Sequence, residues 1–275
     1  MSSDRERERP LVTANAPARG DGFEGQVAFV TGAGAGIGRA IALALAERGA
    51  DVGLLTRSRD RGRACKEAIE ALGRRAVFVA GDVGNWSATN AAVAEVRTSL
   101  GAPSLVVANA GIELRGTVLE TLPSDWERVI STNLSGVFYT CKAVLPSLIE
   151  LGGGSIVIVG SDASLIGSRG YAAYNASKHG LIGLTKCMAL DFGPDGVRTN
   201  IVCPSFVETE MMYRILEKSS PQYEQQLRRV PLGRFGKTED VAQVVLHLLS
   251  ASSSFTNGAV YQLDGGSTAT AARDS

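Results

Sequence analysis

The sequence lacks an excess of charge of either sign and lacks any long apolar run, and each absence excludes a class of protein. Its 275 residues contain 28 Lys and Arg against 28 Asp and Glu, so the formal net charge is zero. This balance gives no reason to expect binding to nucleic acid or to an acidic membrane surface. No apolar run approaches the roughly 20 residues that a transmembrane helix requires, so we expect no membrane partner.

Cysteines are also few, and their arrangement follows no pattern of known chemistry. The four are Cys65, Cys141, Cys187 and Cys203. Their spacing fits neither a metal site nor a framework of paired disulfides. We therefore expect reduced, mostly buried thiols, a cytoplasmic location and no metal.

What the sequence does contain is an alternation of short apolar runs with amphipathic segments, which predicts a single α/β domain. No linker interrupts the alternation. We predict a flexible tail at 1–22, where charges alternate and no apolar signal segment follows, a domain at 23–268 and a second tail at 269–275. Strands are predicted at 26–30, 51–56, 75–80, 105–108, 155–160 and 197–203, and helices at 39–48, 59–72, 86–100 and 174–192. Residues 124–150 are predicted to hold two helical segments around Asn133, and 210–230 a polar helical segment.

A glycine-rich loop joins the first predicted strand to the first predicted helix. Residues 31–38 read TGAGAGIG. Glycine backbone lets amide groups approach a pyrophosphate, and the positive end of the helix dipole favours its charge. The spacing is Gly-x-x-x-Gly-x-Gly, not the Gly-x-Gly-x-x-Gly of the general dinucleotide fingerprint. A glycine turn without a ligand is the alternative, but the flanking strand and helix favour a nucleotide site.

Tyr174 and Lys178 are spaced for one face of a helix, and Ser161 precedes Tyr174 by thirteen residues. An ammonium group beside a phenol is expected to lower the tyrosine pKa and make it usable as a proton donor near neutral pH. A serine hydroxyl from a neighbouring strand end could hydrogen-bond the same substrate oxygen. The three side chains predict redox chemistry on a carbonyl or alcohol. The alternative is a tyrosine that merely packs half-buried on its helix.

Taken together, the loop at 31–38, the segment Asn109-Ala110-Gly111, and residues Asn133, Ser161, Tyr174 and Lys178 resemble the classical, single-domain form of the short-chain dehydrogenase/reductase family. The resemblance covers about 23–268. It implies a single-domain Rossmann fold, with a doubly wound, mainly parallel seven-stranded sheet and helices on both faces. A seventh strand and terminal turn at 258–266 come from the resemblance as well.

The resemblance also implies a role for each catalytic candidate. Tyr174 would be the general acid in reduction and the general base in oxidation. Lys178 would lower its pKa and hold the nicotinamide ribose, while Ser161 would orient the substrate carbonyl. Asn133 would position a water in the proton relay; without the resemblance, it would be taken as a cap or a buried hydrogen-bonding residue.

A set of cofactor-binding positions follows from the same resemblance. Asp82 would accept a hydrogen bond from the adenine amine, although a turn or cap residue is the alternative. The remaining positions are Gly32, Gly36, Ile37, Gly38, Arg57, Val83, Asn109, Gly111, Tyr174, Lys178, Val207 and Thr209. The chain departs from the family at Ala108, where a second asparagine is common, and at Ser205, where glycine usually follows the proline.

The end of the second predicted strand favours NADP(H) over NAD(H). An acidic residue there would bind a ribose 2′-hydroxyl and repel a 2′-phosphate. The chain instead has Thr56-Arg57-Ser58-Arg59, and a guanidinium group pairs well with phosphate oxygens. Against this, Ala35 occupies a loop position where many NADP-dependent relatives carry a basic residue. The alternative is that Arg57 and Arg59 form only a solvated edge.

The substrate is less defined. Glu113, Leu165 and Phe206 are pocket candidates, and the resemblance makes 210–230 a mobile lid. We expect a small carbonyl or alcohol substrate but cannot separate a 3-oxoacyl-carrier-protein reductase from a reductase of cyclic ketones, sugars or secondary alcohols. An NAD-dependent alcohol or sugar dehydrogenase and a non-catalytic nucleotide-sensing protein are the alternative functions. By resemblance, the protein forms a homotetramer or homodimer through 124–150, 174–192 and the terminal strand.

Overall fold

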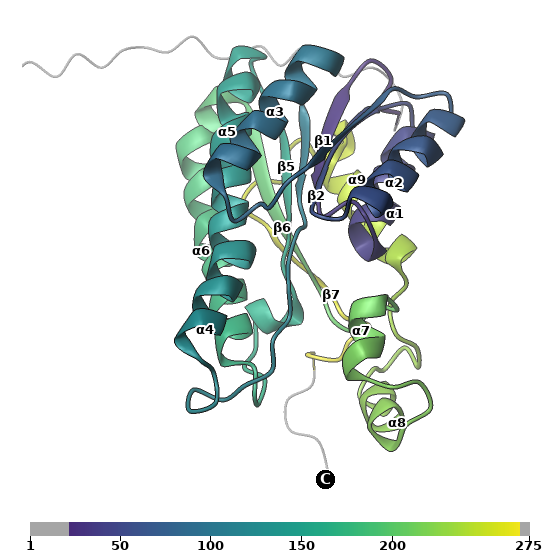
Figure 1. Cartoon of the computed structure of the whole chain (residues 1–275), viewed down its shortest axis with the longest axis vertical. Coiled ribbons are helices and arrows are strands. Elements are labelled where there is room, and N and C mark those ends of the chain that lie inside the picture. The colour runs from purple at the N-terminus through teal and green to yellow at the C-terminus, as the bar shows by residue number, and fades with distance from the viewer. Residues whose placement is uncertain (1–21, 270–275) are drawn as a thin grey trace, which may run out of the picture.

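A computed structural model describes residues 22–269 of the chain. Apart from Gly22 and Ala269, the two predicted tails lie outside these residues. A parallel sheet runs through the molecule in the strand order β3-β2-β1-β4-β5-β6-β7 (Figure 1). The strands are β1 (Val27–Thr31), β2 (Asp51–Thr56), β3 (Ala76–Ala80), β4 (Leu105–Ala108), β5 (Gly154–Val159), β6 (Val197–Pro204) and β7 (Val260–Leu263).

The central strands are apolar because both faces of the sheet are covered. Every residue of β1 and of β4 is buried. Side chains alternate between the two faces: Ala28 and Val30 belong to one core cluster, whereas Val27 and Phe29 belong to the other. The predicted strands agree with the observed ones to within two residues at either end.

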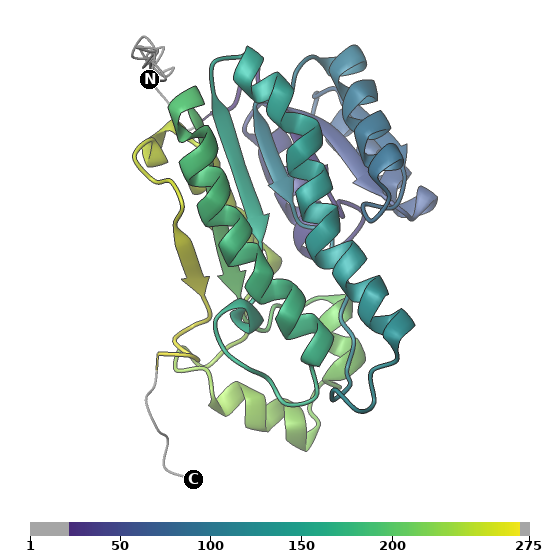
Figure 2. The ribbon, with the colours of Figure 1, turned by 90° about the vertical axis from the view of Figure 1, so that its left-hand side faces the viewer.

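Two layers of helices cover the sheet. One core cluster unites the sheet with α1 (Gly36–Glu47), α2 (Arg59–Ala71) and α9 (Thr238–Leu249). The opposite cluster unites it with α3 (Trp86–Leu100), α5 (Gly136–Glu150) and α6 (Ala172–Phe192). Figure 1 shows the two layers edge-on, and Figure 2 looks onto the face that carries α5 and α6. The predicted doubly wound single-domain fold is confirmed.

Two segments are helical as predicted, and the structure adds detail to each. Residues 124–150 form α4 (Pro123–Ile130) and α5, joined through a π-helical turn at Ser131–Ser135 that contains Asn133. The segment 210–230 forms two short helices, α7 (Glu210–Ile215) and α8 (Pro221–Arg228), beyond the C-terminal ends of the strands (Figures 1 and 2). Among residues 22–269, no helix is long and apolar enough to cross a membrane.

The strand order places a switch point at the centre of the sheet. β1 pairs with β2 on one side and with β4 on the other, so the connection after β1 runs toward β2 while the connection after β4 runs the opposite way, toward β5. Open α/β sheets bind ligands in the crevice that such a reversal leaves at the carboxyl ends of the strands. The fold therefore directs the search for a site to the loops after β1, β4 and β5.

Candidate active site

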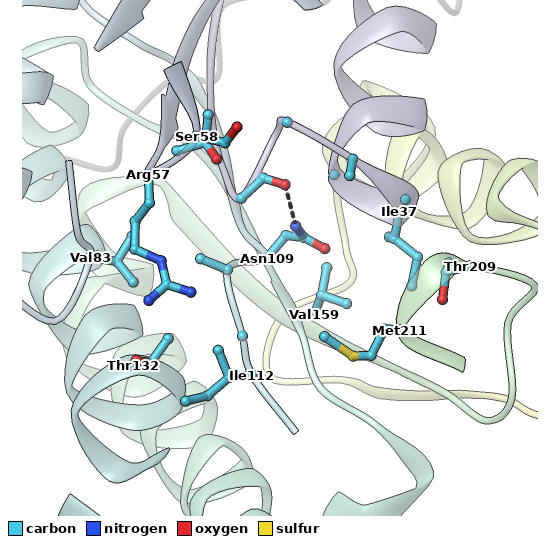
Figure 3. Close-up of a pocket in the computed structure, with 18 of the residues that line it drawn as sticks. Ile37, Arg57, Ser58, Val83, Asn109, Ile112, Thr132, Val159, Thr209 and Met211 are labelled. Atoms are coloured by element: carbon cyan, nitrogen blue, oxygen red, sulfur yellow. Dashed lines mark hydrogen bonds between the residues drawn. The ribbon is translucent and has the colours of Figure 1, made fainter. Parts of the chain in front are cut away.

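A cleft of about 440 Å³ occupies this position. One end is formed by the glycine loop and the end of β2, and the other by the loop after β5 and by α6. Figure 3 shows Arg57 extending from the end of β2 into the cleft, with its guanidinium group between Val83 and Asn109. Twelve predicted cofactor positions line the cleft: Gly32, Gly36, Ile37, Gly38, Arg57, Asp82, Val83, Asn109, Gly111, Tyr174, Lys178 and Thr209.

The glycine loop is shaped by close backbone approach. Gly32 and Gly36 have positive φ angles of 67° and 52°, which other residues adopt only with strain. A Cβ on Gly32 would lie 2.8 Å from Cα of Ala110, and one on Gly38 would lie 2.4 Å from the carbonyl oxygen of Gly32. Side chains at these positions would force the loop away from the end of β4.

The first turn of α1 has no side-chain cap. Its N-cap residue, Ala35, offers no acceptor, whereas Ser58 and Asn85 cap α2 and α3 with their side chains. The leading amide groups of a helix lack partners within the helix. At α1 they are left for an anion in the cleft, and the helix dipole favours negative charge there. The loop therefore fits the pyrophosphate of a dinucleotide.

Asn109 and Thr31 hold this loop against β4. Nδ2 of Asn109 donates to the carbonyl oxygens of Thr31 and Gly32, at 3.0 and 3.4 Å; the bond to Gly32 is dashed in Figure 3. Oγ1 of Thr31 accepts from the backbone amides of Asn109 and Ala110 at 3.1 and 3.2 Å. Asn109 thus lines the cleft and also fixes the loop that would bind phosphate.

Tyr174 and Lys178 line the other end of the cleft, and Ser161 lies beside Tyr174 outside the lining. Ser161 follows β5, and its hydroxyl lowers the pKa of Tyr174 in part by hydrogen bonding. Nζ of Lys178 is 5.7 Å from the centroid of the Tyr174 ring, one helical turn away on α6. The same ammonium donates to the carbonyl oxygen of Val159 at 3.0 Å. The three predicted catalytic side chains are therefore gathered at one place.

A tyrosine, a serine and a lysine beside a dinucleotide-binding loop are the arrangement expected of the short-chain dehydrogenase/reductase family. Sequence comparison supports this assignment. The family model described as Enoyl-(Acyl carrier protein) reductase matches residues 32–268. The chain belongs to the short-chain dehydrogenase/reductase family. This short-chain dehydrogenase/reductase is accordingly an NAD(P)-dependent oxidoreductase that acts on CH–OH/C=O groups.

Individual relatives match along nearly the whole chain. The 3-oxoacyl-(acyl-carrier-protein) reductase FabG of Thermotoga maritima is 38% identical over 251 residues, which cover 89% of this chain and 98% of that protein. The cyclohexanol dehydrogenase of Acinetobacter sp. strain SE19 is 37% identical over 244 residues, which cover 88% and 95%. A gluconate 5-dehydrogenase from Burkholderia cenocepacia J2315, solved in complex with NADP and tartrate, is 31% identical, covers 91% of this chain and 98% of that chain, and has a TM-score of 0.87.

The electrostatics of this short-chain dehydrogenase/reductase correct one expectation. Burial raises the pKa of Tyr174 above that of a free phenol, and the nearby Ser161 only partly offsets this; Glu113 and Asp162 raise it further. Lys178 was expected to lower the tyrosine pKa, but burial lowers the pKa of Lys178 itself to about 8. Desolvation of the phenolate is the largest cause of the raised pKa of Tyr174, and it favours the neutral phenol as a proton donor.

Asn133 is completely buried in the π-helical turn. Its Oδ1 accepts from the amide of Ile112 at 2.8 Å, and its Nδ2 donates to the carbonyl of Ile112 at 2.9 Å and to Oγ of Ser177 at 3.1 Å. Both amide hydrogens are thus committed to protein atoms. The side chain fixes the segment after β4 against α6, and its predicted placement of a water stays a prediction.

Three predicted cofactor or substrate contacts lie outside the lining of the cleft, as do the catalytic candidates Ser161 and Asn133. Val207 is buried in the core of the α1 face, although its neighbour Thr209 lines the cleft and caps α7. The ring of Phe206 packs on Phe235, with centroids 5.6 Å apart, in a small cluster beside α8. Leu165 packs against the core of the α6 face.

Other lining residues were not singled out as contacts in the sequence. Arg61 from α2 borders the cleft, as do Glu210, Met211 and Arg214 from α7, at the start of the segment 210–230 that the resemblance makes a lid. Nη2 of Arg61 is 2.9 Å from Oε2 of Glu210. This ion pair joins residues 149 positions apart, so it could be recognised only once the fold had brought α7 against the nucleotide end of the cleft.

Proposed function

We propose that this protein is an NADP(H)-dependent oxidoreductase that interconverts a ketone and a secondary alcohol, with Tyr174 as the proton donor or acceptor. The observation that carries the proposal is the arrangement of the cleft. An uncapped helix N-terminus and arginines form one end, and Tyr174 and Lys178, with Ser161 beside Tyr174, form the other. The first end suits a nucleotide phosphate and the second suits proton transfer at an oxygen.

A bound nicotinamide would supply the hydride in either direction. The chain supplies the rest: the glycine loop and the start of α1 would hold the pyrophosphate, and Lys178 would reach the ribose. The Tyr174 hydroxyl would donate its proton to a carbonyl oxygen in reduction, or accept the alcohol proton in oxidation. Ser161 would hold the same substrate oxygen by a hydrogen bond. Such placement of proton-transfer and hydrogen-bonding groups is what this chemistry needs from a protein.

The preference for a 2′-phosphate rests on the charges around the end of β2. Arg57 and Arg61 line the cleft there. Nη1 of Arg57 lies 3.7 Å from Oδ2 of Asp82, and both side chains are about half exposed. This ion pair therefore contributes little to stability. The one acid in β2, Asp51, lies at its opposite end, bound to Arg74 and Arg75. The end of β2 thus lacks, among residues 22–269, the carboxylate that would select the ribose hydroxyl of NAD, and this supports the preference for NADP(H).

Titration of the purified protein with NADPH and NADH, followed by nucleotide fluorescence, tests this preference. NADPH is expected to bind more tightly, and Arg57→Asp should remove the difference by weakening NADPH binding alone. Arg59→Asp is the matched control, because it makes the same change of charge at an exposed residue outside the cleft lining. Tighter NADH binding would instead support an NAD-dependent alcohol or sugar dehydrogenase.

A second experiment tests catalysis. Tyr174→Phe should abolish turnover while leaving folding and NADPH affinity close to those of the wild type, because only the transferable proton is removed. Tyr139→Phe is the control, since Tyr139 packs on Trp86 outside the cleft lining. Full activity of the Tyr174 variant would refute the assigned role. A wild-type protein that binds nucleotide but turns over no alcohol or ketone would point to a nucleotide sensor.

A further inference from the structure

Asn175, the residue after Tyr174 in α6, ties this helix to the turn that follows β5. Its Nδ2 donates to the carbonyl oxygen of Ile166 at 2.6 Å and to that of Ala163 at 3.3 Å. A side-chain amide has two hydrogens to donate, so both are used on the backbone of one turn. The side chain therefore joins two segments that carry different parts of the catalytic group.

The turn held in this way, residues 161–166, begins at Ser161. The backbone amide of Ser161 donates to Oγ of Ser164 at 3.2 Å, and the amide of Ser164 donates to the carbonyl oxygen of Ser161 at 2.9 Å. These bonds make the turn a compact unit, but they do not fix its distance from α6. The last carbonyl groups of a helical turn lack partners within the turn, and Asn175 binds two carbonyl groups of this one.

The hydroxyl groups of Ser161 and Tyr174 form a hydrogen bond, although the two residues reach the site from different elements. Ser161 belongs to the turn after β5, whereas Tyr174 belongs to α6. A hydrogen bond between two hydroxyl oxygens requires a separation of about 2.5–3.0 Å, so it is sensitive to the placement of one element on the other. The link through Asn175 starts one residue after Tyr174 and ends on the turn that carries Ser161.

We propose that Asn175 is a positioning residue that sets the place of the Ser161 hydroxyl relative to the Tyr174 hydroxyl. This inference rests on the proposed function and adds to it a residue on which proton transfer depends without contact to the nucleotide. Asn175 lies outside the lining of the cleft. Its effect on the reaction is therefore transmitted by the turn 161–166.

The other end of the same amide separates this role from stability. Oδ1 of Asn175 is buried and lacks a hydrogen-bond partner among residues 22–269. A buried acceptor without a partner lowers the stability of a fold. An apolar side chain of similar shape removes this acceptor together with the two donated bonds, so the gain and the loss in stability oppose each other. Asn175→Leu should therefore fold, and its activity can be judged apart from its stability.

The test measures oxidation of a secondary alcohol by NADP⁺, with cyclohexanol as the first substrate, and NADPH affinity by fluorescence titration. Asn175→Leu should lower kcat by about 10- to 100-fold, the scale of a small misplacement of a catalytic group, and leave NADPH affinity unchanged. Asn90→Leu is the matched control, because it makes the same substitution at an exposed residue of α3 outside the cleft lining.

A double variant identifies the route of the effect. If Asn175 acts through Ser161, Asn175→Leu should cost no further turnover in a Ser161→Ala background. A general role in the structure of α6 would lower turnover by the same factor in both backgrounds. It would also weaken NADPH binding, because Tyr174 and Lys178 line the cleft from this helix. Either of these results, or full activity of Asn175→Leu, would overturn the inference and leave the proposed function intact.

A smaller variant and the wild type complete the design. If Asn175→Leu does not fold, Asn175→Ala gives the same comparison, because its methyl group has no hydrogen to donate to either carbonyl. A wild-type protein that oxidises no secondary alcohol would overturn the proposed function, and the inference with it.

Discussion

Gly38 offers the sharpest test of how the nucleotide loop is built, because its substitution by alanine should harm both stability and binding. The added Cβ would lie 2.4 Å from Nδ2 of Asn109 and 2.4 Å from the carbonyl oxygen of Gly32. Neither atom is the end of a flexible side chain with room to move: one is backbone, and the amide nitrogen is bonded to the loop itself.

The size of the effect follows from these contacts. Overpacking costs about 1–3 kcal/mol, and displacing the Asn109 amide loses two hydrogen bonds at about 0.5–1.5 kcal/mol each. Alanine regains about 0.5–1 kcal/mol over glycine inside a helix. The net loss is about 1–5 kcal/mol, which for a domain of this size lowers the melting temperature by about 2–20 °C. NADPH binding should weaken by at least about tenfold, the equivalent of 1.4 kcal/mol.

Calorimetry and fluorescence titration of Gly38→Ala against Gly183→Ala measure both effects. Gly183 lies in α6, and a Cβ there would meet no atom within 4 Å, so the same substitution should stabilise the protein slightly through helix propensity. A Gly38 variant that melts and binds NADPH like the wild type would refute the argument that close approach of the loop to β4 requires glycine.

Three further predictions concern charged groups. Burial raises the pKa of Asp51, but hydrogen bonds from Arg75 outweigh burial, and the net pKa is lowered. Asp51→Asn should therefore lower the free energy of unfolding by about 2 kcal/mol at pH 7, measured by urea unfolding. This difference from the wild type should vanish as pH falls below the ordinary aspartate range. Burial lowers the pKa of Lys178 from 10.5 to about 8, so the stability of the wild type should rise as pH increases from about 8 to 10.5. Lys178→Met should abolish that rise, and at neutral pH the variant should be more stable than the wild type by on the order of 2 kcal/mol. Glu210→Gln removes the ion-pair partner of Arg61. NADPH binding should then strengthen about two- to fivefold, the scale of one exposed ion pair, while NADH binding stays unchanged. Equal changes for both nucleotides would exclude Arg61 as a phosphate ligand.

The parts of the site that lie close together in the sequence could be predicted from it. The glycine loop is contiguous with its strand and helix, so the local pattern was sufficient. The helical spacing of Tyr174 and Lys178 placed them on one face, and the end of β5 supplied Ser161. Assembly into a tetramer or dimer stays a prediction.

What the sequence could not supply depends on burial or on distant contacts. Helical spacing says nothing of desolvation, and this is why the direction of the Tyr174 pKa was wrong. The π-helical turn that buries Asn133 has no recognised sequence signal. Phe206 looked like a pocket residue, but it packs on Phe235 instead.

The cleft draws its lining from positions between 32 and 214, and this has a consequence for folding. All the strand pairs are parallel, so each requires a long crossover before it can form, and contacts of large sequence separation form slowly. A nucleotide therefore cannot recognise a partly folded chain, and its binding free energy must stabilise the whole domain, by about 2.7 kcal/mol at a hundredfold excess over Kd. Nucleotide added during refolding should thus leave the early steps unchanged and slow only the unfolding of the completed protein.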